Sequence, residues 1–139
     1  MGEVMTDNIF DQQITFIYVA DLEESRKFYE DVFQFPLVLD QGSCRIVSTI
    51  RGGGGYLGYC ERKDRVVDSR GIIFTLVTTK IDNWFVYLQS RGVEIPEPPK
   101  INPDYDIYHF FLHDPDGYTL EIQHFLGSAW ENGLSSVRN

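Results

Sequence analysis

Residues 114–123 read Asp-Pro-Asp-Gly-Tyr-Thr-Leu-Glu-Ile-Gln, and this stretch decides how the C-terminal half of the chain folds. Aspartate at the first position of a turn, proline at the second and glycine at the fourth are typical of a type I turn, and glycine also tolerates the left-handed conformation of a bulge. Alternation along the following strand separates two sets of side chains, apolar Tyr118, Leu120 and Ile122 and polar Thr119, Glu121 and Gln123. A buried carboxylate needs a partner, a metal or a ligand, so the function depends on what Glu121 faces.

Length and composition predict one soluble globular domain. The chain has 139 residues, of which 42% are apolar and 24% charged. Its net charge of -9, from 21 acidic and 12 basic residues, argues against a nucleic-acid partner, since phosphates require Lys and Arg. The acidic excess is compatible with a cationic ligand, although solubility is the simpler explanation.

Cellular location is predicted from what the sequence does and does not contain. No apolar run reaches the roughly 18 residues of a membrane span, and the first residues lack the apolar core of a signal peptide. Cys44 and Cys60 have no metal-like spacing, and they are expected to be free thiols that serve in packing. The sequence therefore predicts a cytoplasmic protein without a membrane partner.

Two similar halves follow a loose arm of residues 1–11. The first half has strand patterns at residues 13–20, 35–40, 44–50 and 56–60, and the second at residues 71–77, 107–113 and 118–125, with a further short strand expected at 93–95. One helix begins after Asp21, which forms a capping pair with Glu24, and a second begins near Asp82 and ends at Gly92. The proline-rich stretch 96–103 is expected to be a stiff loop that flanks or covers a pocket.

A shift of 58 residues superimposes the two halves, taking Ile14 to Ile72 and Phe16 to Phe74. The predicted fold is α+β, with two pseudo-symmetric βαβββ modules that form a cupped mixed sheet and carry their helices on its outer face. A single domain is expected at residues 12–125, with module one at 12–66, module two at 70–125 and a C-terminal tail at 126–139.

Two groups of residues carry a family resemblance. They are Val19-Ala-Asp-Leu22 with Ser25 and Phe28-Tyr29 in the first half, and Arg91-Gly-Val93 with Asp114-Pro-Asp-Gly117 and Leu120-Glu121 in the second. In this order the chain resembles the vicinal oxygen chelate superfamily, which includes glyoxalases, bleomycin-resistance proteins, fosfomycin-resistance enzymes and extradiol dioxygenases. The resemblance covers about residues 13–124 and implies the fold and a homodimer, but it implies no single reaction because this fold hosts many chemistries.

The resemblance also implies where a divalent metal would be held, on the first strand of each half and near the end of the last strand. Ile14 stands at the first of these positions and Gly71 or Ile72 at the second, and none of these residues can bind a metal. Only Glu121 matches its ligand position, whereas a catalytic metal needs about three protein ligands. No cofactor and no metal site are therefore expected, with a divalent metal held partly by water left as an alternative.

Strand alternation places His109 and Phe111 on the cleft side, because Tyr108, Phe110 and Leu112 form the wholly apolar alternative. Glu121 and His109 are the candidate catalytic residues. The candidate ligand-binding residues are Phe16, Tyr18, Phe111, Thr119 and Glu121. The structural alternatives are a Glu121 tied to a nearby Tyr or Arg, a His109 that only lines the wall, and aromatic side chains that fill a closed cleft.

Three functions remain open at this point. The first is a bleomycin-resistance-like homodimer that binds a bulky small molecule, cationic or aromatic, without an intact metal triad. The second is a glyoxalase- or dioxygenase-like lyase, isomerase or oxygenase that uses Glu121 and His109, with or without a divalent metal. The third is an accessory or regulatory domain whose cleft is filled by its own aromatic residues.

Overall fold

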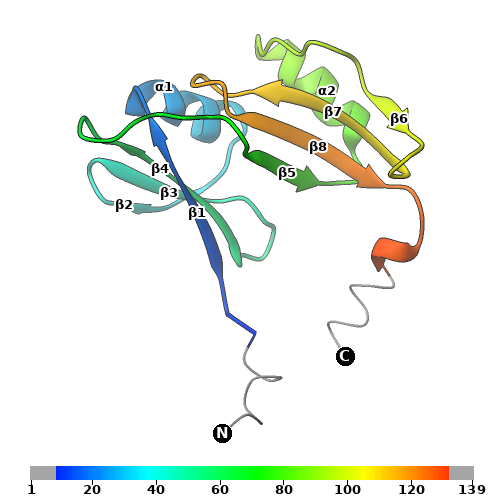
Figure 1. Ribbon diagram of the computed structural model, residues 1–139, viewed down its shortest axis with the longest axis horizontal. Helices are drawn as coiled ribbons and strands as arrows, with labels where there is room; N and C mark the ends of the chain where they lie inside the picture. Colours follow the sequence, from blue (N-terminus) through cyan, green and yellow to red (C-terminus); the bar gives the residue numbers. More distant parts are fainter. Residues whose placement is uncertain (1–8, 132–139) are drawn as a thin grey trace, which may run out of the picture. The chain divides into compact units, whose positions relative to one another are not determined.

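A computed structural model describes residues 9–131, and the chain divides into two compact units, Met1–Asp68 and Ser69–Asn139. Each unit contains one four-stranded mixed sheet and its own helix (Figure 1). The predicted α+β fold with two βαβββ modules is therefore confirmed. The outer parts of the expected arm and tail, residues 1–8 and 132–139, lie outside the described residues.

The first unit has strand order β1-β4-β3-β2. Its elements are β1 (Gln13–Val19), α1 (Leu22–Arg26), the π-helix η2 (Lys27–Val32), β2 (Leu37–Asp40), β3 (Cys44–Ser48) and β4 (Gly55–Glu61). Strand β1 runs parallel to β4, and the other neighbours are antiparallel. This leaves β1 at one edge of the sheet.

The first helix begins where the sequence predicted, because the side chain of Asp21 accepts hydrogen bonds from the backbone N–H groups of Glu23 and Glu24. Its second half was not predicted: from Lys27 the helix is π-helical, and the N–H of Phe33 donates to the carbonyl of Phe28 at 3.0 Å. The side chains of Ser25, Phe28, Tyr29 and Phe33 are buried. Val32, expected on the buried face, is only half-buried because the wider turn changes the helical period that the prediction assumed.

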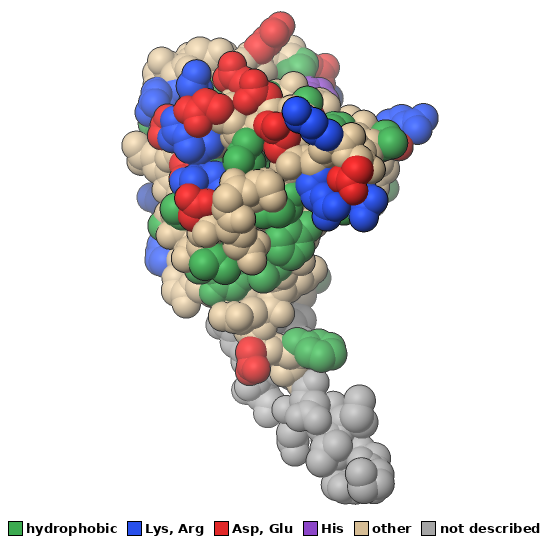
Figure 2. Space-filling model, turned by 90° about the vertical axis from the view of Figure 1, so that its left-hand side faces the viewer, with side chains coloured by type: hydrophobic (Ala, Val, Ile, Leu, Met, Phe, Trp, Pro, Cys, Tyr) green, Lys and Arg blue, Asp and Glu red, His purple; other side chains and the backbone are tan. Residues whose placement is uncertain are grey.

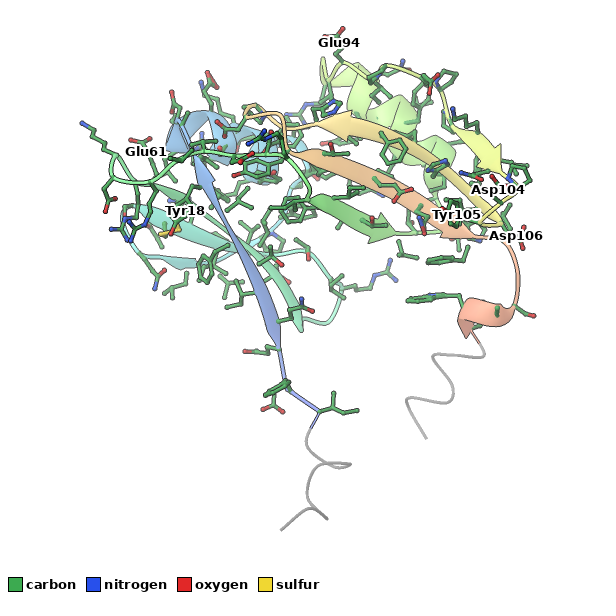
Figure 3. All side chains as sticks on the ribbon, in the orientation of Figure 1. Tyr18, Glu61, Glu94, Asp104, Tyr105 and Asp106 are labelled. Atoms are coloured by element: carbon green, nitrogen blue, oxygen red, sulfur yellow. A yellow bond between two sulfur atoms is a disulfide. The ribbon has the colours of Figure 1, made fainter. Side chains whose placement is uncertain are left out.

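The cysteine prediction was wrong, since Cys44 and Cys60 form a disulfide, seen as the yellow bond in Figure 3. The two residues are direct partners across the antiparallel β3–β4 pair, with their Cα atoms 4.1 Å apart. Their spacing of 16 residues matches no metal motif, and only the pairing of these strands brings the two sulfur atoms together.

The second unit has strand order β5-β8-β7-β6. Its elements are β5 (Ile73–Val77), α2 (Ile81–Ser90), β6 (Lys100–Asn102), β7 (Ile107–His113) and β8 (Thr119–Phe125). Strand β8 lies between β5, to which it is parallel, and β7, to which it is antiparallel. Helix α2 lies along one face of this sheet (Figure 1), and the rings of Phe85 and Phe110 are in edge contact at 5.6 Å.

One strand of the second unit was misplaced by the sequence analysis. Residues 93–95 form no strand, and β6 lies instead at Lys100–Asn102, inside the stretch expected to be a loop. The physical reason is the run of prolines, which lack an N–H: pairing with β7 begins only after Pro99, where Lys100 is the partner of His109.

The hairpin of β7 and β8 follows the prediction from its turn. Gly117 has a φ of 88°, and one carboxylate oxygen of Asp114 accepts hydrogen bonds from the backbone N–H groups of Asp116 and Tyr118 at 2.9 Å. The apolar set of the strand, Tyr118, Leu120 and Ile122, is buried. Beyond β8, the ring of Trp130 stacks on that of Phe125 at 4.6 Å and holds the start of the tail.

The register of the internal repeat differs from the predicted shift of 58 residues. Phe16 lies on the face of its sheet opposite the helix, because its neighbour Ile17 pairs with Tyr59, whose ring stacks on the helical Tyr29. Phe74, in contrast, lies on the helix-covered face of β5. A shift of one more residue restores the equivalence, since a single-residue slip moves every strand side chain to the other face.

Candidate functional site

Glu121 lies at the centre of the second sheet, on the face opposite α2. Its Cα partners are Thr75 on β5 and Phe111 on β7. His109 precedes Phe111 by two residues and therefore shares that face. Because cross-strand partners project to the same side, four side chains from three strands converge here.

A short chain of hydrogen bonds connects these residues. The hydroxyl of Thr75 donates to Oε1 of Glu121 at 3.0 Å, and Nδ1 of His109 lies 2.7 Å from Oε2 of the same carboxylate. His109 is 4% exposed and Glu121 is 8% exposed. Both oxygens of Glu121 are thus engaged, so the carboxylate satisfies its burial without a metal or a ligand.

The remaining ring nitrogen of His109 is the unsatisfied atom of the site. An ionised Glu121 can only accept, so Nδ1 carries the proton that forms their bond, and in the neutral ring Nε2 holds a lone pair. Nε2 is buried, and no residue in the described part of the chain bonds to it. Leaving a buried polar atom unpaired costs about 1–3 kcal/mol, which a bound hydrogen-bond donor would recover.

His109 borders a small pocket of about 40 Å³. The pocket is lined by Pro96, Glu97, Pro98, Lys100, His109, Phe110 and Phe111. The proline-rich stretch thus flanks a pocket, as the sequence analysis expected. A buried water needs roughly 10–15 Å³ by the same measure, so the pocket admits a small group or the edge of a ring but not a whole drug-sized molecule.

The rim of the pocket carries one ion pair. Nζ of Lys100 lies 3.1 Å from a carboxylate oxygen of Glu97, and both side chains are exposed. The polar contribution at the rim is therefore close to neutral, and the walls are apolar. Within the pocket, the unpaired Nε2 is the polar atom best placed to select a ligand.

The donors present do not fit the metal site that the family resemblance implies. Within residues 9–131, no group of three or more His, Cys, Asp or Glu side chains is arranged to hold a metal ion. Glu121 is the only one of the three family positions that carries a ligand, and its oxygens are already bonded to Thr75 and His109. No reaction step through a metal is therefore derived.

The other predicted ligand-binding residues are divided between the units. Phe111 is 38% exposed, and its ring makes an edge contact with that of His109 at 5.1 Å. Thr119 is half-buried on the same face as Glu121. Phe16 and Tyr18 belong to β1 of the first unit, where both are exposed, and Tyr18 is labelled in Figure 3. Their participation in one site with His109 stays a prediction.

Phe16 is held by a feature of its own sheet. Its ring lies directly over Gly58, where a Cβ atom would collide with the ring carbons. The missing side chain at position 58 therefore gives the ring a flat seat on β4, while Phe16 remains more than half exposed. Figure 2 shows that exposed hydrophobic side chains gather beneath a band of charged ones on the face it displays.

Thr75 is the site residue that the sequence analysis missed. An isolated threonine in a strand carries no signal of its own, and the shift of 58 residues gave β5 the wrong face. A shift of 59 would have placed Thr75 opposite the helix, on the side of Glu121.

Comparisons with known proteins agree on the family. The model of the Glyoxalase/Bleomycin resistance protein/Dioxygenase superfamily matches residues 12–122. Among curated proteins, no match to the chain was found. None of the helices in the described part has the length and apolar character needed to cross a bilayer.

Several solved structures are similar to this chain. A glyoxalase/bleomycin resistance protein/dioxygenase from Nocardioides has a TM-score of 0.72 at 18% identity, covering 88% of this chain and 87% of that one. TnmS3, an antibiotic-binding protein from Streptomyces sp. CB03234, has a TM-score of 0.71 at 24% identity, covering 84% and 96%. A glyoxalase/bleomycin resistance protein/dioxygenase from Alicyclobacillus acidocaldarius has a TM-score of 0.70 at 20% identity, covering 85% and 93%. At these identities the similarity shows the fold alone.

Proposed function

Because the chain belongs to the glyoxalase/bleomycin resistance protein/dioxygenase superfamily, we propose that it binds a small molecule at the His109–Glu121 site without a metal. The observation that carries this proposal is the buried, unpaired Nε2 of His109 beside a pocket with apolar walls. The description of TnmS3 as an antibiotic-binding protein supports a binding role for this fold.

Of the two ligand types that the sequence left open, the site favours an aromatic compound over a cationic one. A cation would need a free carboxylate oxygen, but both oxygens of Glu121 accept hydrogen bonds already. The other carboxylate at the pocket, Glu97, is paired with Lys100. Exposed Phe111 at the pocket wall offers a ring for stacking.

A thermal-shift screen of aromatic compounds, cationic compounds and divalent metals tests the proposal. A ligand at one hundred times its Kd stabilises the folded state by about 2.7 kcal/mol, which is a readily measured rise in midpoint. We expect aromatic compounds to raise the midpoint of the wild type and to lose most of this effect in His109→Asn. Glu94→Gln is the matched control, because it alters an exposed side chain that does not line the pocket.

Two results would contradict this proposal. One is an equal response of the wild type and His109→Asn to every aromatic compound. The other is stoichiometric metal in the purified protein that is lost in Glu121→Gln, which would favour the enzyme.

A second candidate is a glyoxalase- or dioxygenase-like enzyme in which His109 moves a proton. The observation in its favour is that Glu121 bonds Nδ1, which is how a general base is oriented with Nε2 available for the proton. Turnover of a carbonyl or phenolic substrate that is abolished in His109→Asn would establish this activity. Tight binding without turnover would leave the binding function.

The resemblance further predicts a homodimer located in the cytoplasm, and both remain part of the proposal. The disulfide of Cys44 and Cys60 is more typical of an oxidising compartment. A thiol assay on protein isolated with a blocking reagent would bear directly on this location. Light scattering of the purified protein would report its oligomeric state.

A further inference from the structure

The unpaired nitrogen of His109 identifies a chemical class of ligand. We infer that the ligand is an uncharged aromatic compound with an O–H or N–H donor on the edge of its ring, and that this donor bonds to Nε2. The inference rests on the proposed binding function and adds the group that is recognised.

The direction of the hydrogen bond follows from the partners of His109. Nδ1 donates to Oε2 of Glu121 at 2.7 Å, and the second oxygen of that carboxylate is occupied by the hydroxyl of Thr75. If the ring were doubly protonated, a charged N–H would be buried without an acceptor, which costs more than an unpaired neutral lone pair. Nε2 is therefore an acceptor, and its complement is a donor.

The groups around His109 on its own and neighbouring strands support an uncharged ligand. Glu121 on β8 is neutralised in effect by two hydrogen bonds, and Gln123, the cross-strand partner of His109, carries no charge. On the other side, Lys100 of β6 is paired with Glu97. Neither sign of charge is left free to attract an ion.

The size and walls of the pocket indicate a ring edge. Its volume of about 40 Å³ admits a hydroxyl or an N–H with its adjoining ring atoms. Pro96 and Pro98 present apolar walls that cannot offer an N–H in competition with the ligand. The aromatic side chain of Phe111 lies against His109 and supplies a surface for the ring itself.

Three probes of similar shape test the inference by calorimetry: 2-naphthol, which carries a donor, 2-methoxynaphthalene, which can only accept, and 2-methylnaphthalene, which can do neither. The variant is His109→Asn, because an asparagine N–H can still reach Glu121 while the acceptor at the Nε2 position is removed. The ratio of the Kd of 2-methylnaphthalene to that of 2-naphthol is compared between wild type and variant, which cancels the difference in hydrophobicity of the probes.

We expect this ratio to be roughly five- to tenfold larger in the wild type than in His109→Asn, the range for one hydrogen bond. We also expect 2-methoxynaphthalene to behave like 2-methylnaphthalene. The ¹⁵N resonance of Nε2 in the wild type should shift with 2-naphthol and not with 2-methylnaphthalene. This second measurement decides the matter if the variant does not fold.

The possible failures are distinguishable. If all three probes bind but the ratio is the same in both proteins and the Nε2 resonance does not move, the donor class is wrong and a binding site remains. If 2-methoxynaphthalene binds as tightly as 2-naphthol, Nε2 acts as a donor and the inference is overturned. If no probe binds at millimolar concentration, both the inference and the proposed function fail.

Discussion

Reduction of the Cys44–Cys60 disulfide should destabilise the protein by a predictable amount. The bond closes a loop of 16 residues between β3 and β4. The chain-entropy relation gives about 3 kcal/mol for a loop of this length, because the link restricts the unfolded chain. An unfolding entropy of roughly 2.1 cal/mol/K per residue over 139 residues converts this to a fall in Tm of about 10 °C, if the whole chain unfolds in one step.

The assay is thermal unfolding followed by circular dichroism, with and without a phosphine reductant at the same protein concentration. Mass spectrometry after thiol alkylation establishes the redox state of each sample. A Cys44→Ala/Cys60→Ala double variant is the matched control, because its Tm should be low and should not respond to the reductant.

The reasoning fails if the fully reduced wild type melts at the temperature of the oxidised form. It also fails if two alkylatable thiols are found in protein that was purified in air, since the paired Cα positions would then not have produced a bond. A loss much larger than 10 °C would mean that the link also supports the folded β3–β4 pair.

Two further predictions concern the first unit. Glu30→Gln should lower the free energy of unfolding by about 2 kcal/mol in urea titrations at neutral pH, because Arg45 loses a carboxylate that it bonds at 2.7 and 2.9 Å. Burial opposes ionisation of Glu30, but hydrogen bonds from Arg45 and Tyr59 outweigh it and hold its pKa below the usual value. The stabilisation is therefore present above about pH 4.3 and is lost as the pH falls through the lower folded pKa, so wild type and variant should converge in acid; a constant difference would contradict this. Gly58→Ala should cost about 1 kcal/mol because its Cβ displaces the ring of Phe16, and the cost should vanish in a Phe16→Ala background, as a double-mutant cycle in urea would show.

Local signals in the sequence predicted much of the second unit. The Asp114–Gly117 turn fixes where β7 ends and β8 begins, and alternation then assigns every side chain of the hairpin to a face. For this reason His109, Phe111 and Glu121 could be expected on one side before any strand pairing was known. The same reasoning expected Leu120 to be buried, which it is.

The features that were missed all depend on contacts between distant residues. The disulfide requires that β3 and β4 pair in the register that sets Cys44 against Cys60. The position of β6 depends on which residue after the prolines first pairs with β7, and here it is Lys100. The π-helical turn around Phe33 inserts a residue into a pattern that was counted with the α-helical period. Propensity and periodicity describe single segments, so they cannot supply these registers.

The role of Glu121 is decided by an uncharged residue. With Oε1 free, the carboxylate could accept a cation or a metal beside the imidazole, as the acidic composition of the chain invited us to expect. The hydroxyl of Thr75 occupies that oxygen at 3.0 Å, and His109 occupies the other. Since Glu121 has no further acceptor to offer in the plane of these bonds, the capacity to select a partner passes to Nε2 of His109, which is buried and unpaired. The net charge of -9 is therefore a poor guide to the ligand, because the acid at the centre of the site is already satisfied by its own sheet.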